Sequence, residues 1–170
     1  MTSANAELGK AVTFDVTDGS ISISGLAAKI SRRVRTAELP VDLAAMVTSR
    51  SDMGNGWTWT TVSSTTLNGR PCTLSLGAFH GHLSQVDWSI RVAGGEYPGG
   101  RPSPGTVAKE MDQMTQILTR AFGPGRLPGR GTGYEKDFPW GSVWLAWDPR
   151  NGVCASGLRY STAQRRQGQD

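Results

Sequence analysis

The chain has 170 residues, of which 37% are hydrophobic and 19% charged, and its formal net charge is +4. With six tryptophans, this composition excludes a disordered chain, which would carry more charge and fewer aromatic residues. No apolar run approaches the roughly 20 residues of a membrane-spanning helix, and residues 1–10 lack the features of a signal peptide. We expect one cytoplasmic domain over residues 1–170, with a frayed polar tail over residues 161–170.

The first third of the chain predicts a β-hairpin followed by two short helices. Apolar and polar residues alternate over residues 12–16 and again over 21–23, on either side of the turn-forming pair Asp18-Gly19. Apolar residues at helical spacing then predict one short helix over residues 26–37. A proline at the first turn favours a second short helix over residues 40–48.

The centre of the chain predicts an antiparallel meander. Trp57 and Trp59 alternate with threonines, Asn68-Gly69 is a strong hairpin signal, and residues 74–78 alternate again. Over residues 85–92 every second residue is apolar, and the residues between them are polar. The meander is therefore predicted to form a sheet with one dry face and one wet face.

Residues 103–122 predict a long amphipathic helix that covers the dry face. The sequence Ser103-Pro104 is typical of a helix start, and Gly123-Pro124 of a helix end. The apolar stripe recurs at helical spacing and consists of Val107, Met111, Met114, Leu118 and Phe122. The predicted fold class is α+β: an antiparallel β-sheet of about five to seven strands, covered on one face by this helix, plus one or two short helices.

A last hairpin is predicted by the alternation over residues 143–147 and 153–160, which flank the turn sequence 148–152. The two cysteines, Cys72 and Cys154, both lie in predicted strands. Two cysteines are too few for a disulfide scaffold, so we expect two buried thiols in preference to a bridge.

The search for reaction centres gives little. His80 and His82 flank a glycine at a predicted turn and could share a metal ion, but no acidic or cysteine ligand at suitable spacing completes such a site. The glycine-rich segment 129–133 does not connect a strand to a helix as a phosphate loop does, and no nucleophile motif is present. We expect no metal, no cofactor and no enzymatic activity; a hydrolase with a histidine base is an alternative.

Irregular sequence gathers on either side of the long helix. Residues 94–105 and 123–133 together hold ten of the 22 glycines and five of the nine prolines. Long irregular loops in compact domains are functional more often than ordinary turns are. The sequence supports a binding surface and a flexible connection equally.

The C-terminal part of the chain contains three short segments that together form a recognisable pattern. It reads Phe-Pro-Trp-Gly-Ser-Val over residues 138–143, Trp-Asp-Pro-Arg-Asn-Gly over 147–152 and Leu-Arg-Tyr over 158–160. With the preceding strands, residues 70–160 resemble bacterial polymorphic-toxin immunity proteins. The resemblance implies a protein that binds and neutralises a cognate toxin. Many immunity proteins for nucleases are acidic, so the charge of +4 implies a toxin with an acidic contact surface, or one that is not a nuclease.

We therefore predict a non-enzymatic, cytoplasmic immunity protein that binds a cognate toxin or effector protein and occludes it sterically. Arginines in the glycine-rich loops would reach the acidic toxin surface. The residues predicted to contact the partner are Arg101, Arg126, Arg130, Glu96, Tyr97, Tyr134, Glu135, His80 and His82.

Two alternatives stay open. A nucleic-acid-binding module would use the basic cluster Arg32, Arg33 and Arg35 together with Trp57 and Trp59. We expect these two tryptophans to be core residues, and an aromatic platform is the alternative. Fourteen acidic residues interspersed with the basic ones favour a solvated basic surface instead. A secretion adaptor or chaperone for a toxin would share the same sequence features.

Overall fold

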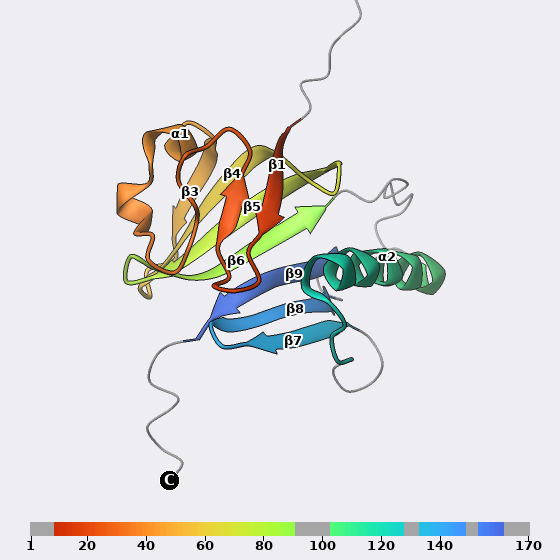
Figure 1. Ribbon diagram of the computed structural model, residues 1–170. Helices are drawn as coiled ribbons and strands as arrows, with labels where there is room; N and C mark the ends of the chain where they lie inside the picture. The colour runs from red at the N-terminus through yellow and green to blue at the C-terminus, as the bar shows by residue number, and fades with distance from the viewer. Residues whose placement is uncertain (1–8, 91–102, 128–132, 149–152, 162–170) are drawn as a thin grey trace, which may run out of the picture.

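The computed structural model describes residues 9–90, 103–127, 133–148 and 153–161 (Figure 1). Its nine strands form one sheet in the order β2-β1-β4-β5-β6-β9-β8-β7, and β3 pairs with β4 beside this path. The strands are β1 (Lys10–Phe14), β2 (Ile21–Ile23), β3 (Val47–Asp52), β4 (Trp57–Leu67), β5 (Arg70–Phe79), β6 (His82–Ile90), β7 (Tyr134–Phe138), β8 (Gly141–Asp148) and β9 (Val153–Tyr160). The helices are α1 (Val41–Ala44) and α2 (Pro104–Phe122), with a 3₁₀ turn, η1 (Thr36–Glu38).

The predicted α+β class is wrong. Strands dominate the described chain, and the sheet curls into a half-barrel instead of lying flat beneath a helix. In Figure 1, α2 lies at one end of this curl, where it packs mainly against β7, β8 and β9. Phe122 at its last turn also contacts Phe14 of β1 and Trp88 of β6. The curl also brings strands together over the core, because β1 pairs parallel to β4 and Phe14 of β1 contacts Trp88 of β6.

The helix predicted over residues 26–37 does not form. Ile30 exchanges both backbone hydrogen bonds with Ile21 of β2, each at 2.8 Å, and both side chains are fully buried. Gly25 precedes this segment with a φ of 77°, a left-handed conformation that helices do not contain. The apolar residues of this segment therefore reach the core individually from an extended loop. The helical turn η1 follows at the end of the segment.

The other local predictions fare better. The first hairpin and the meander are confirmed, and Asn68 and Gly69 form the β4–β5 turn with φ values of 51° and 73°. The second short helix shrinks to α1, because the chain enters β3 at Val47. Strands β3 and β7 were not predicted. The last hairpin, β8–β9, is confirmed with Val143 paired to Leu158.

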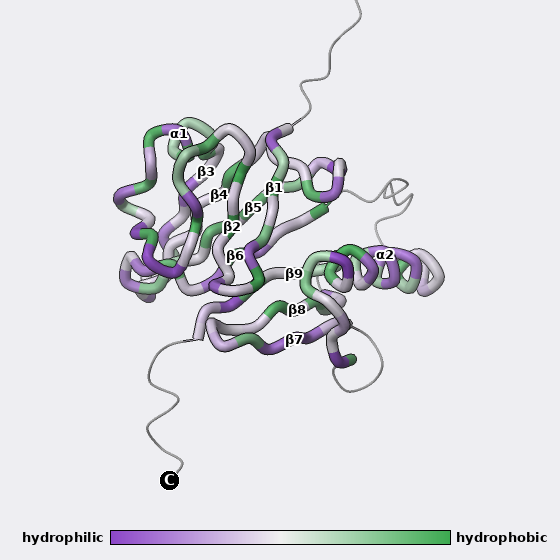
Figure 2. Tube along the Cα trace, in the orientation of Figure 1, coloured by the Kyte–Doolittle hydropathy of each residue, from purple (hydrophilic) through white to green (hydrophobic). Residues whose placement is uncertain are grey.

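Helix α2 forms as its end signals predict. The Ser103 hydroxyl accepts a hydrogen bond from the Thr106 N–H at 3.2 Å, and Pro104 occupies the first turn. Gly123 ends the helix with a φ of 82°. Figure 2 shows hydrophobic and hydrophilic residues alternating around α2. Its buried residues are Met111, Met114, Ile117, Leu118 and Phe122.

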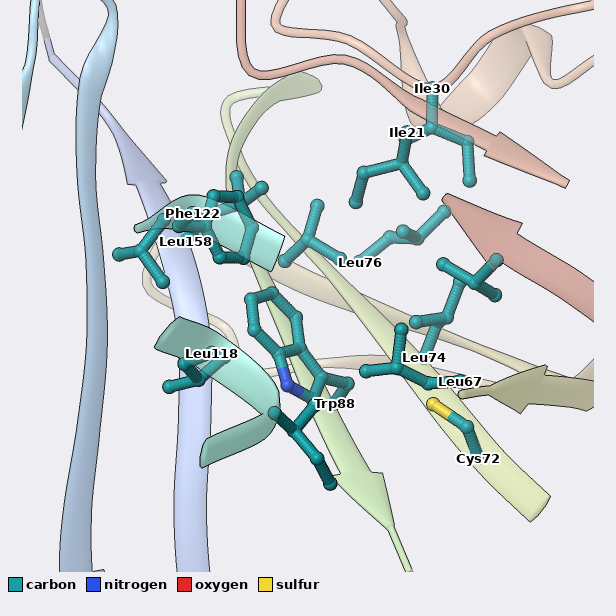
Figure 3. Close-up of a cluster of buried hydrophobic side chains, with 14 of the residues drawn as sticks. Ile21, Ile30, Leu67, Cys72, Leu74, Leu76, Trp88, Leu118, Phe122 and Leu158 are labelled. Atoms are coloured by element: carbon teal, nitrogen blue, oxygen red, sulfur yellow. The ribbon is translucent and has the colours of Figure 1, made fainter. Parts of the chain in front are cut away.

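The core joins α2 to both halves of the sheet. In Figure 3, Trp88 lies between the strand that carries Leu74 and the helix that carries Leu118 and Phe122. The Phe122 ring is 4.8 Å from that of Phe14 and 6.4 Å from that of Trp88. Burial of these side chains is the main source of stability. No described helix is long and apolar enough to cross a bilayer.

Candidate functional site

The face of the sheet that points away from the core is open and carries mixed chemistry. Residues paired across strands point to the same side, so the register defines this outer face. One row of paired residues runs across six strands: Trp59, Gly77, Gln85, Arg159, Ser142 and Asp137. A second row lies beside it: Thr61, Ser75, Asp87, Gly157, Trp144 and Glu135. Apart from the two glycines, every residue of both rows is half-buried or exposed.

A linked polar cluster occupies the middle of the outer face. The Gln85 amide donates to a carboxylate oxygen of Asp87 at 2.6 Å, and Arg159 donates to the Gln85 carbonyl oxygen at 3.3 Å. The Arg159 guanidinium also lies 4.7 Å from the centre of the Trp144 ring, within the range of a cation–π contact. Partial burial raises the pKa of Asp87, while Gln85 and Arg159 oppose that rise. These contacts link Gln85, Asp87, Arg159 and Trp144 into one cluster.

Two glycines make room for these side chains. A Cβ atom on Gly157 would lie 2.5 Å from the Asp87 carboxylate. A Cβ atom on Gly77 would lie 2.8 Å from the Trp59 ring, which therefore lies over the bare backbone of β5. The glycines thus set how closely Asp87 and Trp59 lie against the sheet.

Aromatic side chains gather at the end of the outer face that carries the β5–β6 turn. The Trp57 ring stacks on Trp59 with 6.1 Å between centroids, and Phe79 contacts Trp57 at 5.5 Å. His80, at the turn, contacts Phe79 at 4.2 Å and has a φ of 48°. Phe79 is 42% exposed. The expectation that the two tryptophans are core residues is therefore wrong: both lie on the outer face and are half-buried, outside the core cluster.

An aromatic row continues from this cluster into the basic segment. Trp57 pairs with Phe79, Phe79 pairs with His82, and His82 forms an isolated bridge with Arg35. Two backbone hydrogen bonds, from Thr36 to Gly81 and from Leu83 to Val34, hold the segment there at 3.3 Å each. Arg35 therefore lies at the end of a row made of Trp57, Phe79, His82 and Arg35, which is hereafter called the aromatic row.

The sequence-predicted contact residues fall in different environments. His80 and His82 are both exposed: His82 belongs to the aromatic row, and His80 lies beside it. Arg126 lies against the edge strand β7, and its guanidinium pairs with Glu135 and Asp137 at 3.2 Å each. Glu96, Tyr97, Arg101 and Arg130 lie outside the described residues.

Tyr134 lies in the core, and its predicted role as a contact residue does not fit that position. The residue is 2% exposed, and its hydroxyl donates to the carbonyl oxygen of Gly123 at 2.8 Å. Burial raises the pKa of Tyr134 to about 12. Its ring also lies against Gly125, where a Cβ atom would approach it to 2.5 Å. Tyr134 therefore supports the chain after α2 instead of facing a partner.

The described residues offer little for catalysis. They contain no group of three or more His, Cys, Asp or Glu side chains that could hold a metal ion. A cavity of about 790 Å³ opens beside β1 and β4, and Lys10 and Cys72 are among its lining residues. Burial raises the pKa of Cys72 to about 11, so this thiol is protonated at neutral pH and is a poor nucleophile. Both cysteines are free thiols, as predicted, although Cys154 is only half-buried.

Sequence reasoning missed most of the outer face. Gln85, Asp87 and Arg159 were visible as the polar positions of alternating strands, and Phe79 as an apolar residue before a turn. These residues become neighbours only through the register between paired strands. The alternating pattern within one strand does not reveal that register.

Comparison with known proteins gives one structural match. No protein-family model and no curated protein matches the sequence. A solved structure described as "Rhs1-CT in complex with cognate immunity protein RhsI1" is similar to the chain with a TM-score of 0.49 and 13% identity. The match covers 92% of this chain and 91% of that chain. At this level the similarity assigns neither a family nor a function.

Proposed function

We propose that the protein is a non-enzymatic protein-binding module, and more specifically an immunity protein that binds a cognate bacterial toxin in the cytoplasm and occludes it. The observation that carries the proposal is the composition of the open outer face. Trp, Tyr and Arg are the residues that most often dominate the energetics of protein interfaces, and Trp59, Trp144 and Arg159 share this face. The resemblance of residues 70–160 to immunity proteins supports the same assignment.

The size of the outer face also fits a protein partner. Seven strands from β3 to β7 border it, and at about 4.8 Å between neighbours they span about 29 Å along the sheet. A specific interface buries about 800 Å² on each partner, which corresponds to a square of about 28 Å. Measured along the curl, the face therefore has about the width of one such contact.

The outer face carries both basic and acidic residues, which suits a protein partner whose surface also carries charges of both signs. Arg159 lies in the middle and Arg35 at one end, whereas Asp87, Glu135 and Asp137 also point outward. Alternating charges of this kind set the orientation of a protein partner and reject partners of uniform charge. The overall charge of +4 would still raise the association rate with an acidic toxin.

Co-expression tests the proposal. The protein is produced in a bacterial host together with the toxin candidate encoded next to it, and growth and complex formation are measured. Rescue of growth, together with a stoichiometric complex that survives nuclease treatment, is the expected result. Growth arrest with no complex would refute the immunity assignment.

A nucleic-acid-binding module is the second candidate, because the aromatic row ends at Arg35. Base stacking on aromatic rings beside cations is how single strands are bound without sequence preference. Asp87, Glu135 and Asp137 would repel phosphates along the rest of the face, which favours the protein partner. Binding of a single-stranded oligonucleotide that falls steeply with added salt would support this candidate instead.

A further inference from the structure

We infer that the aromatic row is the anchor of the partner interface, and that it receives an acidic segment of the toxin that also carries an apolar side chain. This inference rests on the proposed function and assigns its contact surface. It replaces the glycine-rich loops as the centre of the interface. Three features of the described residues support it: exposed aromatic area, unpaired cations and a fixed backbone.

The exposed aromatic area comes from Phe79. Phe79 is 42% exposed, and it is not an isolated apolar residue, because Trp57 and His80 lie against its ring. Neighbouring rings provide further apolar area beside it, because Trp57 and Trp59 are half-buried on the same side of the sheet. An apolar side chain of the partner that packs on Phe79 would therefore displace water from several aromatic rings at once.

The cations come from the segment that binds the β5–β6 turn. Arg32, Arg33 and Arg35 are all exposed, and no ion pair of theirs is found within the described ranges. Arg126 differs, because two carboxylates of its own chain already hold its guanidinium. A partner carboxylate at Arg126 would compete with Glu135 and Asp137, whereas one at Arg35 would meet no such competition. The acidic occupant therefore belongs beside Arg35.

The backbone of the row is fixed before binding. His80 donates its N–H to the carbonyl oxygen of Gly56 at 2.8 Å, which ties the β5–β6 turn to the β3–β4 turn. The His80 ring also fills the space over Gly56, where a Cβ atom would approach it to 2.8 Å. A preformed surface loses little conformational entropy on binding, which leaves more of the contact energy as affinity.

Variants of the row test the inference directly. Phe79→Ala removes the exposed ring, and Arg35→Glu reverses the terminal charge. Their matched controls are Leu127→Ala, an apolar residue that is 63% exposed elsewhere, and Arg120→Glu, an exposed cation on α2. Affinity for a catalytically inactive toxin is measured by surface plasmon resonance, and circular dichroism checks that each variant is folded.

Both row variants are expected to weaken toxin binding by about 30-fold or more, as truncated hot spots do, while both controls should change the affinity less than about threefold. Arg35→Glu should also reduce the salt dependence of the association rate. Wild-type affinity in folded Phe79→Ala and Arg35→Glu proteins would overturn the inference and leave the proposed function standing. Absence of toxin binding by the wild-type protein would instead refute the proposed function itself.

Two other occupants are distinguished by the same variants. If Phe79→Ala abolishes self-association in sedimentation experiments while toxin binding is unchanged, the row joins two copies of this chain and the inference is wrong. If the row variants abolish binding of a single-stranded oligonucleotide but not of the toxin, the row binds nucleic acid and the inference is likewise wrong.

Discussion

Phe122→Ala is expected to be among the most destabilising single substitutions in this protein. Phe122 is 4% exposed and lies at the last turn of α2. Its ring lies 4.8 Å from Phe14, 6.4 Å from Trp88 and 6.1 Å from Phe138. These partners belong to β1, β6 and β7, so one side chain joins the helix to distant parts of the curled sheet.

The expected loss follows from the cost of a cavity. Truncation of a buried Phe to Ala removes about 3–5 kcal/mol of stability, and aromatic pairs add about 0.5–1.5 kcal/mol each beyond area burial. With three such contacts, Phe122→Ala should lie in the upper part of that range, at about 4–5 kcal/mol. For a chain of this length each kcal/mol lowers Tm by about 2–4 °C, so Tm should fall by about 8–20 °C.

Urea unfolding followed by tryptophan fluorescence measures this loss, and Trp88 next to Phe122 makes the signal sensitive to the site. Phe122→Leu keeps most of the buried volume and should lose less than about 1.5–2 kcal/mol. Lys109→Ala, exposed on the same helix, should change stability by no more than about 0.5 kcal/mol. A loss below about 1 kcal/mol for Phe122→Ala would mean that α2 does not hold the two halves of the sheet together.

Three further substitutions probe the site and its support. Tyr134→Phe removes the 2.8 Å hydrogen bond to the Gly123 carbonyl and should lower the free energy of unfolding by about 0.5–1.5 kcal/mol in urea titrations; an unchanged value would show that this bond does not secure the helix end. Gly157→Ala places a Cβ atom 2.5 Å from Asp87 and should cost about 1–3 kcal/mol, whereas Gly105→Ala, with nothing nearer than 3.9 Å, should not destabilise the protein; equal effects would contradict the close-packing argument. Asp87→Asn removes a carboxylate whose pKa is raised by burial, so the ionised form is the one that folding disfavours. The Asp87→Asn protein should therefore be thermally more stable than the wild type at neutral pH. The difference in stability should shrink as the pH falls through the raised pKa of Asp87, and a difference that does not depend on pH would refute this reasoning.

The parts of the fold that the sequence predicts are those fixed by neighbouring residues. The Asn68-Gly69 turn needs two positive φ values, and these two residue types supply them at little cost. The ends of α2 are set by Ser103 and Gly123 in the same local way. In both cases the structure-determining contacts span only a few residues, so a short window of sequence contains them.

The missed elements depend on distant partners. Strand β3 reads Val-Thr-Ser-Arg-Ser-Asp and is largely exposed, so it has no hydrophobic alternation, and it is a strand because β4 supplies its hydrogen bonds. Ile30 shows the reverse error. Its apolar spacing matches a helix, yet its backbone bonds to Ile21 fix it in an extended bridge. A tertiary partner decided the conformation in both cases.

The candidate site was only partly predictable for the same reason. His80 and His82 were selected as a pair beside a turn, and both lie beside the aromatic end of the outer face. That Trp57 and Arg35 belong to one row follows only from the pairing of β4, β5, β6 and the basic segment. The glycine-rich loops were predicted as the contact surface because their composition can be read from a short stretch of sequence. The sequence does not show that Arg126 in one of these loops forms an ion pair with Glu135.

The separation of charge and aromatic area along the row predicts how binding divides into steps. Attraction between Arg35 and an acidic partner acts before contact and over about 8–10 Å at ordinary ionic strength, so it governs the association rate. Phe79 contributes only after water has left its exposed ring, so its loss acts on the dissociation rate. Arg35→Glu should therefore slow association, and Phe79→Ala should speed dissociation with association nearly unchanged. If both substitutions altered the association rate alone, the ring would not be buried in the complex, and the row would steer the toxin without anchoring it.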